Sequence, residues 1–187
     1  MNNLPILSSR IEHFNTIYFV QNEKKSGNLH RMNNKDAIEN NSPQPIRRID
    51  HIGHAVTDIK KATDYYINTL GYAVICEEDV PDHGVKLVFL ALTDGNPAAQ
   101  ANFPTIELLS PTVANTPLAR FLAKRGEGLH HICYRVDSVS AELARLKAQG
   151  MPLIDLEPRK GSRDLWIAFL HPKGNFGVLV ELCSEQQ

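Results

Sequence analysis

The stretch Gly128–Val136 (GLHHICYRV) decides the fold, because the earlier stretch Ile49–Val56 (IDHIGHAV) repeats its pattern. The two stretches align when His51 is placed on His131, at an offset of 80 residues (131 − 51), and the isoleucine and valine that follow each histidine then coincide as well. Repetition at a fixed offset indicates a duplicated structural unit. The sequence therefore predicts one strand-and-helix unit that occurs twice.

A second pair of segments repeats in the same way, at a slightly shorter offset. Thr105–Leu109 (TIELL) and Val178–Cys183 (VLVELC) each set one glutamate among strand-forming apolar residues. Glu107 and Glu181 are 74 residues apart (181 − 107), as expected for repeats whose loops differ slightly in length. Each unit therefore contributes one histidine and one glutamate.

Size and composition limit the class of protein. The chain has 187 residues, 42% of them hydrophobic, and a formal net charge of −1, which suits one ordinary domain or two small modules that share a core. Such a charge gives no broad attraction to nucleic acid, and no apolar run reaches the roughly 20 residues that span a bilayer. We expect a cytoplasmic protein without a nucleic-acid or membrane partner.

The three cysteines are Cys76, Cys133 and Cys183. Their number is odd and no CxxC spacing occurs, so they are expected to be reduced thiols of a cytosolic protein. Cys133 and Cys183 fall inside predicted strands, where a free cysteine acts as a small buried hydrophobe.

Residues 1–45 are expected to form a largely flexible N-terminal arm. Residues 21–45 are rich in Asn, Lys and Ser and end in Ser-Pro-Gln-Pro, a composition that buries too little apolar surface to offset the entropy of ordering. The ordered domain is expected over 46–184. It divides into a first module of about 46–112, a bridging helix of about 116–126 and a second module of about 128–184.

Alternation and helical spacing predict the same succession of elements in both modules. The expected first-module elements are a strand at 49–56, a helix at 59–70 and strands at 73–77, 85–92 and 105–109. The expected second-module elements are a strand at 129–136, a helix at 139–150 and strands at 152–155, 165–170 and 178–183. Several strands with one helix per unit indicate an α+β fold in which two curved sheets enclose a cleft.

Strand alternation then places four side chains in that cleft. Apolar neighbours face the helix, so His51 and His131 point the other way, as do Glu107 and Glu181. A buried carboxylate costs several kcal/mol unless it is paired or binds a metal. Imidazole and carboxylate ligands together suit Zn²⁺, Co²⁺, Mn²⁺, Ni²⁺ or Fe²⁺. The quartet therefore predicts a metal site, without selecting the metal.

Four segments resemble the methylmalonyl-CoA epimerases of the vicinal oxygen chelate superfamily, which includes glyoxalase I and extradiol dioxygenases. They are Ile49–Ile52 (IDHI), Ile106–Pro111 (IELLSP), Gly128–Ile132 (GLHHI) and the His171-Pro172-Lys173 turn that leads to Gly177–Leu182 (GVLVEL). The resemblance covers about 46–184. It implies two paired βαβββ modules in a curved mixed sheet, a homodimer, and a divalent ion (Co, Mn, Ni or Zn) held by His51, Glu107, His131 and Glu181.

The activity implied by this resemblance is interconversion of (R)- and (S)-methylmalonyl-CoA through an enolate, with an acyl-CoA as the small-molecule partner. Glu181 is then the first candidate base and Glu107 the second. Two alternatives use the same fold: a glyoxalase I-type lactoylglutathione lyase, and a non-catalytic protein that binds a small molecule. A binder has no need of four ligands in register.

The sequence departs from the family at two places. Some epimerases carry a second acid where this chain has Lys86 and Leu87. Lys86 is considered as a proton donor for the opposite face, but a solvated lysine on a strand edge is the preferred interpretation. The loop Gly161–Leu165 (GSRDL) also differs from the glycine-rich loop usual in the family.

The remaining histidines and cations are assigned roles outside the metal site. Four histidines are interpreted as structural or loop residues: His54, His83, His130 and His171. Four cations are candidates for the phosphates of coenzyme A: Arg159, Lys160, Arg163 and Lys173.

Overall fold

The computed structural model describes residues 46–92 and 103–187. The arm expected at 1–45 and the connection at 93–102 lie outside the described residues. Among the described residues, no helix is both long and apolar enough to cross a membrane.

The described elements follow the predicted order in both modules. The first module holds β1 (Arg48–Ala55), α2 (Ile59–Asn68), β2 (Tyr72–Val80), the 3₁₀ turn η1 (Pro81–His83), β3 (Val85–Leu92) and β4 (Thr105–Pro111). Helix α4 (Pro117–Arg125) bridges to the second module. That module holds β5 (Gly128–Arg135), α5 (Val139–Ala148), β6 (Arg159–Lys160), η2 (Ser162–Asp164), β7 (Trp166–Leu170), η3 (Pro172–Gly174) and β8 (Val180–Ser184).

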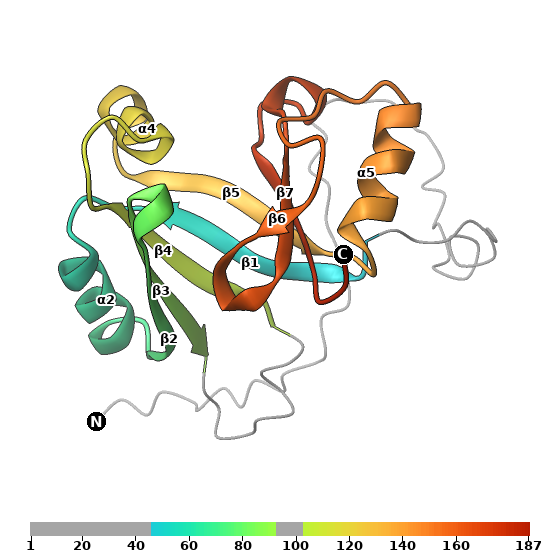
Figure 1. Ribbon diagram of the computed structural model, residues 1–187. Coiled ribbons are helices and arrows are strands. Elements are labelled where there is room, and N and C mark those ends of the chain that lie inside the picture. The colour runs from blue at the N-terminus through green and yellow to red at the C-terminus, as the bar shows by residue number, and fades with distance from the viewer. Residues whose placement is uncertain (1–45, 93–102) are drawn as a thin grey trace, which may run out of the picture. The chain divides into compact units, whose positions relative to one another are not determined.

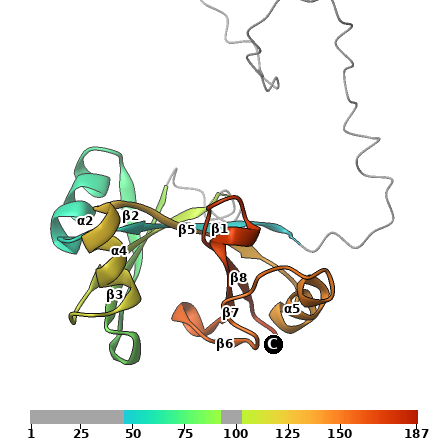
Figure 2. The same cartoon turned by 90° about the horizontal axis from the view of Figure 1, so that it is seen from above.

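The strands form one mixed sheet in the order β2-β3-β4-β1-β5-β8-β7-β6. In Figure 1, β1 and β5 run side by side across the middle, with β2–β4 and α2 at one end and β6–β8 and α5 at the other. The view from above shows that both outer groups of strands project to the same side of β1 and β5 (Figure 2). The predicted α+β fold, with two βαβββ modules in a curved mixed sheet, is confirmed.

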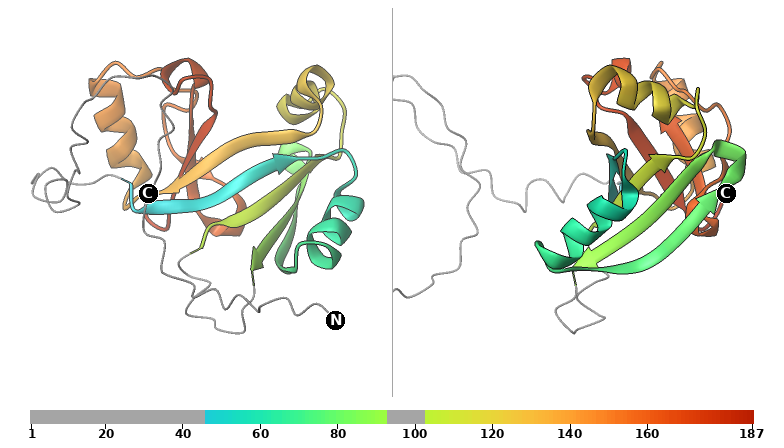
Figure 3. Two further views of the ribbon diagram at one scale, coloured as in Figure 1. Left: turned by 180° about the vertical axis from the view of Figure 1, so that it is seen from behind. Right: turned by 90° about the vertical axis from the view of Figure 1, so that its left-hand side faces the viewer.

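The two modules meet through antiparallel pairing of β1 with β5. Ile52 lies opposite Ile132, and Gly53 lies opposite His131. Within each module the first and last strands are parallel neighbours, β1 with β4 and β5 with β8. The view from behind shows this central pair with one module on either side (Figure 3). The site strands of both modules are therefore adjacent in the order β4-β1-β5-β8.

Each helix covers one face of its own module, as the alternation predicts. Val56, Val88 and Leu108 are buried together, and Ile59 and Tyr66 of α2 pack against them. In the second module, Val136 and Leu182 of the sheet are buried with α5. The opposite face of the first module buries a separate cluster around Ala55, Phe89, Leu109 and Leu118. Helices α2 and α5 therefore cover one face of the sheet, and the opposite face is the one that can form the cavity.

The strand predicted at 152–155 is wrong. Here only Leu153 makes a strand-like bridge, to Leu170, and the amide groups of Ile154 and Asp155 both donate to the carbonyl oxygen of Phe169. Two amides that converge on one carbonyl cannot continue a ladder, and Pro152 has no amide hydrogen to donate. The edge strand next to β7 is instead the short β6, which spans only Arg159–Lys160.

Candidate metal centre

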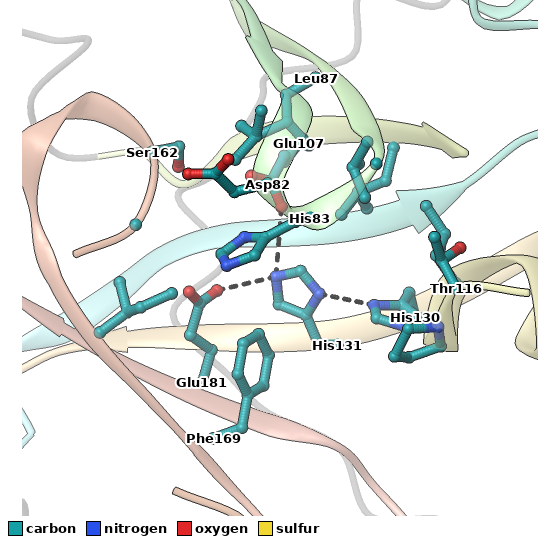
Figure 4. Close-up of a pocket in the computed structure, with 18 of the residues that line it drawn as sticks. Asp82, His83, Leu87, Glu107, Thr116, His130, His131, Ser162, Phe169 and Glu181 are labelled. Atoms are coloured by element: carbon teal, nitrogen blue, oxygen red, sulfur yellow. Dashed lines mark hydrogen bonds and ion pairs between the residues drawn. The ribbon is translucent and has the colours of Figure 1, made fainter. Parts of the chain in front are cut away.

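Four ionisable side chains from four adjacent strands converge on one point. The Nε2 atoms of His51 (β1) and His131 (β5) lie 3.1 Å apart. Oε2 of Glu181 (β8) lies 3.1 Å from His51 Nε2 and 3.0 Å from His131 Nε2. Oε2 of Glu107 (β4) lies 3.5 Å and 3.3 Å from the same two atoms. The structure thus brings together all four residues that the repeat selected, and Figure 4 shows Glu107 and Glu181 meeting at His131.

The chemistry of this donor set fits a divalent transition-metal ion. One donor atom from each of the four residues lies within 4.8 Å of all the others. Each residue is at most 5% exposed, so water cannot solvate the two carboxylates freely. Two imidazoles and two carboxylates are the ligands that zinc, cobalt, manganese or nickel accept. This cluster could therefore hold a metal ion.

Mutual ion pairing sets the protonation of the cluster. Burial alone would lower the pKa of His131, but hydrogen bonds and ion pairs with Glu107 and Glu181 outweigh it and raise the pKa to about 9. Burial likewise opposes the ionised form of Glu107, yet the charges of His51 and His131 lower the pKa of Glu107 to about 2. The pKa of His51 is raised and that of Glu181 lowered through the same contacts. Without an ion, the imidazoles hold protons that a metal would displace.

Asp50 fixes the other ring nitrogen of His51. His51 Nδ1 lies 3.0 Å from Asp50 Oδ1, and Arg135 donates to Oδ2 of the same carboxylate from 2.7 Å and 3.0 Å. Arg163 donates to Oδ1. Burial favours the neutral acid, but the hydrogen bond from His51 and the charges of Arg163 and Arg135 keep the pKa of Asp50 well below its usual range. With Nδ1–H donated to Asp50, Nε2 is left as the ligand atom, the usual arrangement around a ligating histidine.

A neutral histidine, His130, fixes the Nδ1 atom of His131, as Asp50 fixes that of His51. The Nδ1 atoms of His130 and His131 lie 3.0 Å apart. Burial, and then the positive charge of His131, lower the pKa of His130 to about 4, so His130 is neutral and accepts the hydrogen from His131 Nδ1. Phe121 of α4 packs edge-on against the His130 ring, with centroids 4.9 Å apart. The two ligand imidazoles therefore differ in their outer partner, an anion for His51 and a neutral ring for His131.

Gly53 makes room for the His131 ring. A Cβ at this position would lie 2.2 Å from Cε1 and 2.3 Å from Nδ1 of His131, far inside van der Waals contact. The glycine lies opposite His131 in the β1–β5 pairing. A bare backbone on β1 is therefore a condition for the orientation of the ligand on β5.

The cluster opens into a cavity of about 480 Å³ between the modules. Much of its wall is apolar and comes from both modules: Val80, Val85, Leu87, Leu109, Leu118, Ile167 and Phe169. His83 and Arg159 also line the cavity from facing modules, with Arg159 Nη1 3.4 Å from His83 Nε2. Figure 4 shows the His83 ring reaching toward the ligand cluster from the β2–β3 connection. A volume of this size accommodates a small acyl group with polar ends.

Several residues differ from their expected roles. Lys86 is not among the cavity residues; its Nζ lies 3.7 Å from Glu77, so it is not a proton donor for the site. Arg163 is paired with Asp50 and so is not free for coenzyme A phosphates. His130 and His83, interpreted as structural or loop residues, also line the cavity.

Other expectations agree with the structure. His54 hydrogen-bonds the Tyr66 hydroxyl, and His171 accepts from the amide of Lys173, so both are structural. The cysteines are free thiols, with Cys133 and Cys183 buried. The sequence pattern does not identify Gly53 as a residue of the site, because nothing local marks it. Asp50 is signalled only by the Asp-His dipeptide that it forms with His51.

Substitution Gly53→Ala is expected to abolish tight metal binding, because the added methyl group must displace the His131 ring. Overpacking of this kind costs about 1–3 kcal/mol of stability. Thermal unfolding and metal titration of the purified variant measure the two effects. Gly71→Ala is the matched control for the metal titration, since nothing lies within 4 Å of a Cβ at that position. Unchanged metal affinity in Gly53→Ala would contradict the steric argument.

Metal binding at pH 7 is expected to release at least one proton. His131 has its pKa raised from 6.5 to about 9 in the metal-free protein, so its stabilising ion pairs are fully present below pH 6.5 and are lost as the pH rises through 9. A metal needs the neutral imidazole, so its affinity should rise with pH up to roughly 9. Calorimetric titration in buffers of different ionisation enthalpy counts the protons; a count of zero would refute this protonation state.

Comparison with known proteins agrees with this geometry. Residues 50–169 match the Glyoxalase/Bleomycin resistance protein/Dioxygenase superfamily. The ethylmalonyl-CoA/methylmalonyl-CoA epimerase of Cereibacter sphaeroides is 40% identical over 139 residues, which are 73% of this chain and 97% of that protein. The mitochondrial methylmalonyl-CoA epimerase of Homo sapiens is 39% identical over 138 residues, 73% of each chain.

A solved structure extends the similarity to three dimensions. A Streptomyces coelicolor methylmalonyl-CoA epimerase in complex with 2-nitronate-propionyl-CoA matches with a TM-score of 0.68 and 35% identity, over 74% of this chain and 94% of that one. The chain therefore belongs to the glyoxalase/bleomycin resistance protein/dioxygenase superfamily, with methylmalonyl-CoA epimerases among its relatives.

Proposed function

We propose that this protein is an isomerase that interconverts the (R) and (S) forms of methylmalonyl-CoA. The observation that carries the proposal is the buried His51, Glu107, His131 and Glu181 cluster at the base of a 480 Å³ cavity. Relatives named as methylmalonyl-CoA epimerases, at 39% and 40% identity, support this reaction over a lactoylglutathione lyase. They also support an enzyme over a protein that only binds a small molecule.

The α-hydrogen of the substrate is carried by the carbon between a thioester and a carboxylate. The thioester acidifies it, whereas the negative charge of the carboxylate opposes enolate formation unless a cation neutralises that charge. The four ligands would hold a divalent ion, with cobalt, manganese, nickel and zinc as candidates. When bound, the ion supplies a Lewis acid that draws electron density from the substrate's oxygens as the enolate forms. The protein's own residues must then remove a proton from one face of the carbon and return one to the other.

Glu181 is the first candidate for the base and Glu107 the second. In the metal-free protein both are held ionised by the neighbouring imidazoles. Each contacts those rings through Oε2, which leaves Oε1 to exchange a proton with the substrate. They reach the cluster from different strands, β8 and β4. Leu87 and Leu109 line the cavity wall and keep bulk water from the enolate carbon.

The same proposal includes the substrate partner, the oligomeric state, the cellular location and the domain bounds. The acyl-CoA would be the small-molecule partner, with the phosphates of coenzyme A near Arg159, Lys160 and Lys173. We propose a cytoplasmic homodimer without nucleic-acid or membrane partners. We also propose that the catalytic domain comprises 46–184 and that 1–45 form a separate arm.

The reaction is tested by proton NMR of methylmalonyl-CoA in D₂O with the metal-loaded protein. We expect loss of the α-proton signal well above the spontaneous rate, and His131→Ala should abolish it because a ligand is removed. Lys86→Ala is the matched control and should exchange at the rate of the unaltered protein, since Lys86 pairs with Glu77 outside the cavity. Absence of exchange with all four metals would remove this substrate from consideration.

The two carboxylates are separated by starting from single epimers. Removing a positioned base lowers proton transfer by roughly 10²–10⁴-fold. We expect Glu181→Gln to lose exchange from one epimer and Glu107→Gln to lose it from the other, each measured with saturating metal. Equal loss from both epimers in both variants would show that the glutamates act only as ligands.

A further inference from the structure

The loop between β6 and β7 has an unusual backbone. Arg163 and Asp164 are consecutive and have φ angles of 54° and 55°, in the left-handed region that residues with a Cβ rarely adopt. Such a conformation persists only where the surroundings determine it. The same loop lines the cavity through Gly161 and Ser162. Whatever holds Arg163 in place therefore also sets the wall of the cavity.

The Arg163 side chain leaves its own module and binds the first one. The Cζ atom of Arg163 lies 4.3 Å from the centroid of the Phe89 ring on β3. The backbone amide of the same residue donates to Oε2 of Glu78 on β2 at 3.1 Å. Its Nη2 donates to Oδ1 of Asp50 on β1. These partners come from three strands of the first module, so the loop of the second module is anchored across the interface. Asp164, in contrast, pairs with Lys160 within its own module, at 2.7 Å.

The Asp50 contact leads directly to a metal ligand. Oδ1 of Asp50 faces both Arg163 Nη2 and His51 Nδ1, and those two nitrogens lie 3.2 Å apart. Arg135 occupies Oδ2, so the plane of the carboxylate is fixed from both sides. Asp50 is only 6% exposed, which excludes water as an easy substitute for a lost donor. The direction of the His51 ring thus depends on a carboxylate that Arg163 holds.

We propose that Arg163 is a positioning residue that couples the placement of the β6–β7 loop at the cavity wall to the orientation of the metal ligand His51. The inference rests on the metal site of the proposed function and goes beyond it, because it assigns a role to a residue that touches neither metal nor substrate. Arginine suits this role because its planar group can stack on Phe89 while one nitrogen donates to the carboxylate. Lysine has no planar group to stack.

Metal affinity is the first measurement. We expect Arg163→Gln and Arg163→Ala to weaken Co²⁺ binding roughly 10–100-fold, as loss of a ligand's outer partner does, and to alter the visible spectrum of the Co²⁺ protein. Arg163→Lys should lie between these variants and the unaltered protein. Arg145→Gln is the matched control: this arginine pairs with Glu142 on α5 and should leave Co²⁺ affinity unchanged.

Chemical rescue separates positioning from general stability. Methylguanidinium added to Arg163→Ala should restore both Co²⁺ affinity and the spectrum, since it can fill the space between Phe89 and Asp50. Restored thermal stability without restored affinity would overturn the proposal, as would unchanged affinity in folded Arg163→Ala and Arg163→Gln. If Arg163→Ala fails to fold, Arg163→Gln and Arg163→Lys carry the same comparison.

The ¹⁵N signals of the His51 ring keep this test independent of the reaction. In the metal-free unaltered protein we expect the hydrogen on Nδ1 to remain hydrogen-bonded to Asp50, with a shifted and broadened signal in Arg163→Ala. An unaltered protein that binds no metal would refute the proposed function, while the ring signals would still decide whether Arg163 orients His51. Identical ring signals in both proteins would overturn the inference.

Discussion

The antiparallel pairing of β1 with β5 is the constraint on which the rest of the site depends. Because Ile52 lies opposite Ile132, the histidine that precedes each isoleucine faces the cavity, and the two are diagonal neighbours, with His51 opposite Cys133 and His131 opposite Gly53. The parallel partners β4 and β8 flank this pair and bring one glutamate each. Four ionisable groups thereby meet where they cannot be hydrated, so they neutralise one another as ion pairs unless an ion takes the place of the protons.

Much of this arrangement could be predicted from the sequence, because it depends on short-range periodicity that occurs twice. Alternation in 49–56 and in its repeat separated the helix face from the cavity face, and both faces have the predicted residues. The same period-two argument, applied to β3, would have placed Lys86 on the face opposite Leu87. Leu87 lines the cavity in the structure whereas Lys86 does not, as expected for the preferred interpretation of Lys86 as a solvated lysine.

The remaining features depend on contacts between distant segments, which no local pattern encodes. Arg163 and Asp50 are 113 residues apart, and nothing in the GSRDL loop indicates that its arginine turns into the other module. Gly53 is needed because a ring from another strand occupies the space of its Cβ. The strand predicted at 152–155 is wrong for the same reason, because a contact with a distant segment decides its conformation. The amides of Ile154 and Asp155 both donate to the carbonyl oxygen of Phe169 on β7.

The division of the ligand set has a consequence for the history of the chain. Each module supplies one histidine and one glutamate, so a single copy of the unit offers half a coordination sphere, and two copies are needed for a complete one. After duplication, however, the halves ceased to be interchangeable. The first copy keeps a glycine because the second has a histidine ring against it, and the second keeps an arginine whose carboxylate partner belongs to the first. A substitution at any of these positions in one half therefore changes how well the other half fits it.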